Sequence, residues 1–133
     1  MSHVSRLAAV IVGLDSLDAG ARRLGGELMR GQTSARFYGG RSPCLHAVRF
    51  PNRAEYEVGV VAGEREGEFA LTADTYVSGG LAPIIGANGE LLVMACGIER
   101  TKAAARAQGH SVEEIALPNG SVKVRIHLAG GGR

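Results

Sequence analysis

The chain has 133 residues, of which 45% are hydrophobic and 21% are charged, and its formal net charge is +2. This length suits one domain with a real hydrophobic core, and this composition is typical of a globular protein and excludes a disordered chain. We therefore predict a single domain over residues 1–129, followed by a flexible glycine-rich tail at residues 130–133.

The sequence gives no indication of a membrane segment. The apolar run from Leu7 to Val12 is too short for a membrane span and lacks the cleavage pattern of a signal peptide. We expect a cytoplasmic protein that does not bind membranes. Cys44 and Cys96 stand alone, without the spacing of a zinc or redox site, which favours two reduced thiols over a disulfide.

The first half of the chain predicts a strand, a helix and two further strands. Residues 3–12 are rich in β-branched and apolar side chains and predict a central strand. Residues 33–50 predict two short strands separated by a turn at residues 39–43. Between these segments, apolar residues at helical spacing predict an amphipathic helix that Gly31 ends: Leu14, Leu17, Ala21, Leu24 and Leu28.

Residues 54–76 alternate most regularly between apolar and polar side chains, and they predict a β-hairpin with a loop at residues 63–66. We expect Val60 to lie opposite Phe69 and Val58 opposite Leu71 on the buried face. A slip of one residue would bury charged side chains, so the pattern determines which face is buried.

The same register places three carboxylates together on the outer face of this hairpin. Glu55 is expected opposite Asp74, with Glu57 diagonal to Asp74, and like charges directly opposite each other are destabilising. A neighbouring cation is therefore expected. One hypothesis is a site for Mg²⁺ or Ca²⁺, which prefer oxygen ligands, or an acid/base pair. The alternative is neutralisation by a basic side chain of a neighbouring strand, with these candidates: Arg36, Lys123 and Arg125.

The segment from Val77 to Gly89 is predicted as a loop that is long for a compact domain. It contains three large apolar side chains, and exposed apolar loop tips often bind partners. We predict a partner-binding surface formed by Tyr76, Leu81, Ile84 and Ile85. The alternative is that the three aliphatic side chains fold back onto the core.

The last part of the chain predicts a helix over residues 90–108, ended by Gly109, and then a second hairpin. The dipeptide Asn119-Gly120 is the one preferred in two-residue type I′ turns. Such a turn pairs Leu117 with Val122, and Ile115 with Val124, on the buried face.

These elements predict an α+β fold with a largely antiparallel sheet and two helices on one of its faces. A ferredoxin-like arrangement with an inserted hairpin is the specific fold that we expect. Both hairpins and both helices are expected to share one core, with these members: Val58, Val60, Phe69, Leu71, Ile115, Leu117, Val122, Val124, Leu17, Leu24, Leu28, Leu91 and Ile98.

Nearly the whole chain resembles an uncharacterised family typified by hypothetical chloroplast reading frame thirty-five, found in algal plastids, cyanobacteria, other bacteria and phages. The matching segments are Met1-Ser2-His3-Val4-Ser5, Arg36-Phe37-Tyr38-Gly39, Tyr56-Glu57-Val58-Gly59, Leu71-Thr72-Ala73-Asp74, Ala107-Gln108-Gly109 and Asn119-Gly120-Ser121-Val122. The chain departs from the family pattern at Glu57, where the family usually has Asp, near Thr75-Tyr76, where it has aromatic residues, and at Cys96 and Ile98, where it has tyrosines. The family is a domain of unknown function, and the resemblance implies an accessory role beside an AAA-type ATPase.

No nucleophile stands beside a histidine in the local sequence, so the residues favour a protein that is not an enzyme. The four histidines are scattered, and His3 is singled out because it lies in the N-terminal segment that resembles the family. The leading hypothesis is a small accessory or adaptor domain that acts through protein–protein contacts. One alternative is a metal-dependent enzyme or metal-binding protein with a divalent cation at the acidic hairpin face. The other is a nucleic-acid-binding protein, motivated by the pI near 8.8 and by five basic residues, or a phage structural protein, which only the range of the resembling family allows. The five basic residues are Arg36, Arg41, Arg49, Lys123 and Arg125.

Overall fold

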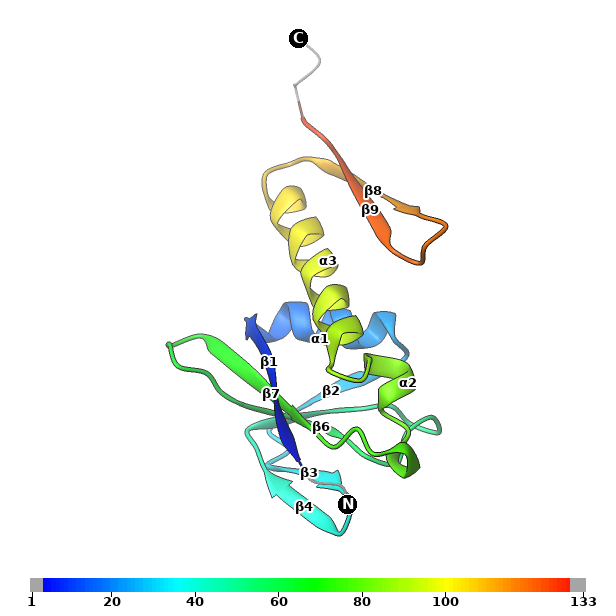
Figure 1. The fold of residues 1–133 in the computed structure, drawn as a ribbon. Coiled ribbons are helices and arrows are strands. Elements are labelled where there is room, and N and C mark those ends of the chain that lie inside the picture. Colours follow the sequence, from blue (N-terminus) through cyan, green and yellow to red (C-terminus); the bar gives the residue numbers. More distant parts are fainter. Residues whose placement is uncertain (1–3, 130–133) are drawn as a thin grey trace.

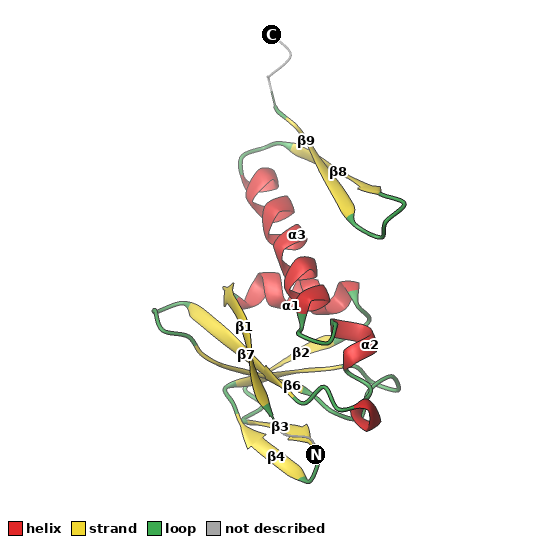
Figure 2. Ribbon diagram, viewed as in Figure 1, coloured by secondary structure: helices red, strands yellow, loops and turns green. Residues whose placement is uncertain are grey.

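The protein, in the computed structural model, has the predicted α+β fold, and the structure describes residues 4–129 (Figure 1; Figure 2). A five-stranded antiparallel sheet has the strand order β1-β7-β6-β5-β2, and two separate hairpins pair β3 with β4 and β8 with β9. The strands are β1 Ser5–Val12, β2 Glu27–Arg30, β3 Ser34–Phe37, β4 Gly40–Pro43, β5 His46–Arg49, β6 Val58–Ala62, β7 Glu68–Ala73, β8 Ser111–Ala116 and β9 Val122–His127. The helices are α1 Leu14–Arg23, the 3₁₀ turn η1 Val77–Gly79, α2 Ala82–Ile85 and α3 Glu90–Ala107. The predicted tail at 130–133 lies outside the described residues.

The helices α1 and α3 lie on one face of the five-stranded sheet, and the β3–β4 hairpin lies on the other (Figure 1). The main core joins the sheet to the helices, since Leu17 of α1 and Leu92 of α3 belong to the same buried cluster as Val60 and Leu71. A smaller cluster lies under the β3–β4 hairpin. The ferredoxin-like detail is not confirmed, because α1 connects the two edge strands β1 and β2 and α3 leads out of the sheet.

The first predicted helix is shorter than expected, because two glycines end it. Gly25 has φ +85°, its N–H donates to the Arg22 carbonyl at 3.1 Å, and the Gly26 N–H donates to the Ala21 carbonyl at 2.8 Å. This is a Schellman C-cap, in which a glycine takes the left-handed conformation. Leu28, predicted to lie in the last helical turn, therefore belongs to β2.

The segment predicted as two strands separated by a turn at residues 39–43 contains three strands instead. Gly40–Pro43 is strand β4, and the chain reverses at Tyr38-Gly39, where Gly39 has φ +87°. A glycine in this position removes the steric cost of a positive φ. The tight turn leaves Tyr38 at the tip of an exposed hairpin.

The central hairpin keeps its predicted faces although its register differs by two residues. Val60 pairs with Leu71, not with Phe69, and the Gly63 N–H donates to the Glu68 carbonyl at 2.8 Å to close a loop at residues 64–67. Gly67 has φ +81°, which excludes it from a regular strand and moves the loop. Because side chains alternate with a period of two, the buried face is unchanged.

The register of the C-terminal hairpin, β8–β9, differs from the prediction by one residue. A shift of one residue places different side chains of the two strands on the same face. Ala116 pairs with Val122, and the Leu117 N–H donates to the Ser121 carbonyl at 2.9 Å. Pro118 has no N–H, so it cannot close the predicted two-residue turn. The loop instead contains three residues, of which Gly120 has φ +86°.

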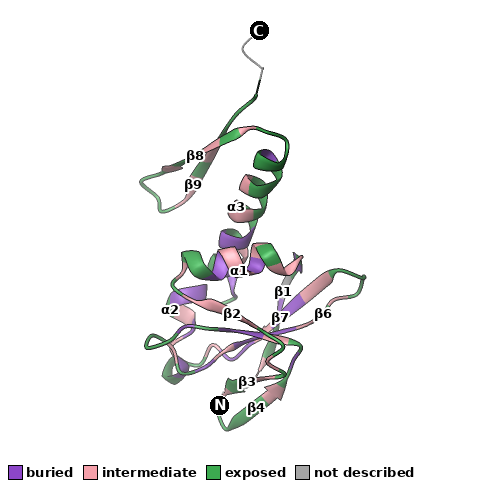
Figure 3. Ribbon diagram, turned by 180° about the vertical axis from the view of Figure 1, so that it is seen from behind, coloured by how far each residue is buried: buried purple, intermediate pink, exposed green. Residues whose placement is uncertain are grey.

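This hairpin, which we call the C-terminal arm (residues 111–127), projects from the body beside α3, and no residue of the arm is fully buried (Figure 3). The prediction that it shares the main core is therefore wrong for Ile115, Leu117, Val122 and Val124. It is also wrong for two residues of α3, because Leu91 is exposed and Ile98 is half-buried outside the main core. Ion pairs tie the arm to the helices: Glu114 contacts Arg23 at 2.8 Å and Lys102 at 2.5 Å.

Candidate functional site

The predicted partner-binding loop is folded differently from the expectation. Leu81, Ile84 and Ile85 are buried in the main core, held by the short helix α2, and so offer no exposed apolar surface. The alternative that these side chains fold back onto the core is the one that the structure shows. Of the four predicted residues only Tyr76 is exposed.

Tyr76 forms an exposed aromatic pair with Tyr38, a residue that the sequence analysis did not single out as a binding residue. The two ring centroids lie 5.8 Å apart in an edge-to-face arrangement, with Tyr38 55% and Tyr76 44% exposed. The neighbouring Val77 is 82% exposed. The signal for Tyr38 in the sequence is an aromatic residue directly before a glycine turn, but only the fold brings Tyr76 beside it.

Asp74 fixes the backbone of both tyrosines. Its side chain is almost fully buried, at 1% exposure. One carboxylate oxygen accepts the Tyr38 N–H at 3.1 Å and the other accepts the Tyr76 N–H at 3.0 Å. A buried carboxylate is costly unless it accepts hydrogen bonds. Asp74 therefore joins the β3–β4 turn to the segment after β7 and holds the tyrosine pair in place.

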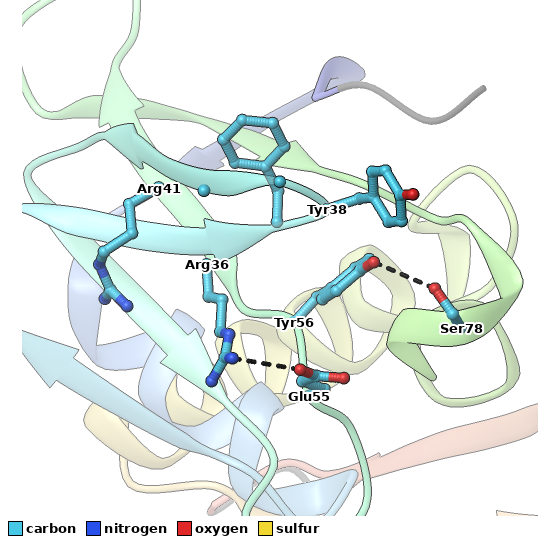
Figure 4. Close-up of a pocket in the computed structure, with 9 residues that line it drawn as sticks. Arg36, Tyr38, Arg41, Glu55, Tyr56 and Ser78 are labelled. Carbon is cyan, nitrogen blue, oxygen red and sulfur yellow. Dashed lines mark hydrogen bonds and ion pairs between the residues drawn. The ribbon is translucent and has the colours of Figure 1, made fainter.

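An open groove of about 570 Å³ lies beside this pair, between the β3–β4 hairpin, the segment before β6 and η1 (Figure 4). We call it the Tyr–Arg groove; its lining residues are Arg36, Phe37, Tyr38, Gly39, Gly40, Arg41, Glu55, Tyr56 and Ser78. Figure 4 shows the Tyr56 hydroxyl directed at Ser78, and the two oxygens share a hydrogen bond of 3.0 Å.

Backbone contacts fix the wall of the groove that η1 provides. The Gly79 carbonyl accepts the N–H groups of Glu55 at 2.9 Å and Tyr56 at 3.2 Å. A Cβ at Gly79 would overlap the Tyr56 ring, so only glycine allows η1 to approach so closely. Two backbone hydrogen bonds and this close approach therefore hold η1 against the segment before β6.

The three carboxylates of the predicted metal site have separate partners. Glu57 accepts hydrogen bonds from the Gln32 side-chain amide at 3.0 Å and the Arg36 N–H at 2.9 Å, and it contacts Arg41 at 3.3 Å. Glu55 forms an ion pair with Arg36 at 3.2 Å, while Asp74 is bound to backbone N–H groups.

No group of three or more potential metal ligands is present in residues 4–129. The alternative of neutralisation by basic side chains fits Glu55, which contacts Arg36, and Glu57, which contacts Arg41, a residue that was not among the candidates. The candidates Lys123 and Arg125 lie in the C-terminal arm, and Asp74 is bound by backbone N–H groups instead of a cation. Metal binding at Glu55, Glu57 and Asp74 stays a prediction.

No histidine or cysteine of residues 4–129 lines the groove. His46 accepts the Gly31 N–H at 2.9 Å, and His110 accepts the Ala129 N–H at 3.0 Å, which are structural roles. Burial raises the pKa of Cys44 and raises that of Cys96 to about 11, so neither thiol is activated as a nucleophile. The prediction for His3 falls outside the described residues.

None of the helices in residues 4–129 is both long and apolar enough to cross a membrane. Compared with family models, with curated proteins and with solved structures, the chain has no match. The resemblance to the reading-frame family thus stays a prediction from the sequence alone.

Proposed function

We propose that this protein is a small accessory or adaptor domain without enzymatic activity, and that it binds a protein partner through the Tyr–Arg groove. The observation that carries the proposal is the exposed pair of Tyr38 and Tyr76, whose backbone N–H groups are both bound by the buried Asp74. Tyrosine and arginine are the residue types most enriched among energetic hot spots of protein interfaces. Prior ordering of the pair lowers the entropy lost on binding.

The chemistry of the groove favours binding over catalysis. The residues that line it include no histidine and no cysteine, so it lacks a general base of that kind and an activated thiol. The Ser78 hydroxyl is hydrogen-bonded to Tyr56, and the carboxylate that lines the groove, Glu55, is ion-paired with Arg36. A groove of this kind, with exposed aromatic rings and guanidinium groups, is suited to recognising another molecule.

Charge pairing favours a protein partner over nucleic acid. Binding along a nucleic-acid backbone needs several basic side chains that remain free to contact successive phosphates, and one exposed ion pair that can exchange its anion does not supply them. Five basic side chains were candidates for such a role, and four of them contact acidic side chains, in the pairs Arg36–Glu55, Arg41–Glu57, Arg49–Glu27 and Arg125–Glu113. An AAA-type ATPase, which only the sequence resemblance implies, is a reasonable first partner to assay.

The test is affinity capture from a native lysate with three versions of the protein. We expect the wild type to recover a specific protein and the double variant Tyr38→Ala/Tyr76→Ala to lose it. The control is Leu45→Ala/Leu128→Ala, which removes exposed apolar side chains elsewhere and should leave recovery unchanged. Circular dichroism would confirm that each version is folded. Equal recovery by all three, or no specific protein, would contradict the proposal.

A further inference from the structure

The two arginines of the Tyr–Arg groove lie directly opposite each other. Arg36 of β3 pairs with Arg41 of β4, so both side chains leave the same face of the hairpin. Like charges in this position repel, and each guanidinium is met by a carboxylate, Glu55 at 3.2 Å and Glu57 at 3.3 Å. Both guanidinium groups of the groove therefore already contact a carboxylate, of which Glu55 lines the groove and Glu57 lies outside its lining.

These two contacts differ in the exposure of the carboxylate and in the number of other hydrogen bonds that it accepts. The Glu57 side chain is 16% exposed and accepts hydrogen bonds from a backbone N–H and an amide as well as from Arg41. The Glu55 side chain is 57% exposed, and among the described residues its carboxylate contacts only Arg36, itself 54% exposed. Exposed ion pairs of this kind contribute little free energy. Glu55 can thus be exchanged for another carboxylate at small cost, whereas Glu57 cannot.

A carboxylate from a partner would bind Arg36 more strongly than Glu55 does. Contacts between guanidinium and carboxylate strengthen when they are two-pronged and shielded from water. A partner that packs on Tyr38 and Tyr76 would cover the groove and provide this shielding. The exposed Glu55 pair marks the place where that carboxylate would lie.

The exposed edge of the β3–β4 hairpin also indicates how a segment of a partner protein would be recognised. Strand β4 has four residues and ends at Pro43, which has no N–H to donate to an added strand. The short edge therefore gives few backbone hydrogen bonds, and recognition depends on side chains. A groove of about 570 Å³ accommodates the side chains of a short segment and not a whole folded surface.

We propose that the Tyr–Arg groove binds a short acidic peptide segment of the partner protein. One carboxylate of the segment takes the place of Glu55 on Arg36, and an adjacent apolar or aromatic side chain packs on Tyr38 and Tyr76. This inference depends on the proposed function, which it makes more specific by naming the chemistry of the partner.

The experiment selects peptides from a random display library on the 133-residue protein. Peptides that also bind Tyr38→Ala/Tyr76→Ala are removed, and the remaining peptides are synthesised with a fluorescent label for anisotropy titrations. We expect an excess of Asp and Glu in the selected peptides. Arg36→Gln should weaken their binding by about tenfold or more, since it removes a covered charge contact. Glu55→Gln should tighten binding, because it removes the competing carboxylate.

Arg49→Gln is the matched control, because Arg49 also forms an exposed ion pair, with Glu27, on another part of the sheet. It should leave the affinity unchanged. Selected peptides that are neutral or basic, or a loss of affinity in Glu55→Gln, would overturn the acidic class and leave the proposed function standing. No tyrosine-dependent selection at all would overturn both. A labelled oligo-dT that binds more tightly than every selected peptide, and loses binding in Arg36→Gln, would overturn the inference in favour of nucleic acid.

Discussion

Replacing Asp74 by alanine should destabilise the protein and release the tyrosine pair. The change removes the acceptor of the Tyr38 and Tyr76 N–H groups, at 3.1 and 3.0 Å, from a position that is 1% exposed. Each donor left unsatisfied costs about 1–3 kcal/mol. Because both contacts are only partly shielded, we expect the lower part of the summed range, a loss of about 2–4 kcal/mol in the free energy of unfolding.

Urea denaturation of matched variants measures this loss. Asp74→Asn retains one acceptor oxygen but sets its NH2 group against the other N–H, so it should also destabilise the protein, by at least the cost of one unsatisfied donor, about 1–3 kcal/mol. Asp18→Ala is the control, because Asp18 forms only an exposed helical ion pair with Arg22 and should change the stability by less than about 0.5 kcal/mol. At urea concentrations where Asp74→Ala remains folded, its affinity for the selected peptides should still be lower than that of the wild type.

The reasoning would be refuted if Asp74→Ala were no more destabilised than Asp18→Ala. Asp74 would then not bind the two turns together, and the tyrosine pair would not be ordered before binding. The binding site would then not be preformed, even if the groove bound the selected peptides tightly.

Three further predictions test the packing, the arm and the thiols. A Cβ at Gly20 would lie 2.7 Å from the backbone nitrogen of Cys96, whereas one at Gly97 meets nothing within 4 Å; Gly20→Ala should therefore lower the melting temperature, and Gly97→Ala should raise stability by up to about 1 kcal/mol. The hydrogen bond from Lys102 and the contact with Arg23 lower the pKa of Glu114. The ionised Glu114 therefore stabilises the C-terminal arm at a pH above the ordinary pKa of a glutamate, and this stabilisation is lost as the pH falls through the lowered pKa. Amide hydrogen exchange in β8 and β9 should thus be faster in Glu114→Gln than in the wild type at pH 7, and the difference should vanish in acid. Burial raises the pKa of Cys96 to about 11, so iodoacetamide at pH 8 should label it only after unfolding; rapid labelling of the native protein would contradict its burial.

Strong periodic patterns were predicted correctly from the sequence, and special backbone positions account for most of the errors. The helix expected over residues 90–108 is α3, Glu90–Ala107, and Val58, Val60 and Leu71 are buried as the alternation requires. The errors arose where glycine or proline sets the geometry. Gly25 ends α1 early, and Pro118 prevents the predicted two-residue turn of the C-terminal hairpin.

The sequence alone determined the α+β class, the long helix and the buried face of the central hairpin, because these follow from local periodicity. It also indicated Tyr76 as a binding residue, but for a loop whose apolar side chains proved to be core. Only the tertiary structure decided that Tyr38 lies beside Tyr76, that Asp74 is buried and binds both backbones, and that Arg36 and Arg41 face the same groove. The contacts of Tyr38 with Tyr76 and with Asp74 join segments far apart in the chain, and local spacing carries no information about which distant turns the folded core brings together. Arg36 and Arg41 are neighbours in the β3–β4 hairpin, but the turn that pairs them depends on the strand β4, which the sequence did not predict.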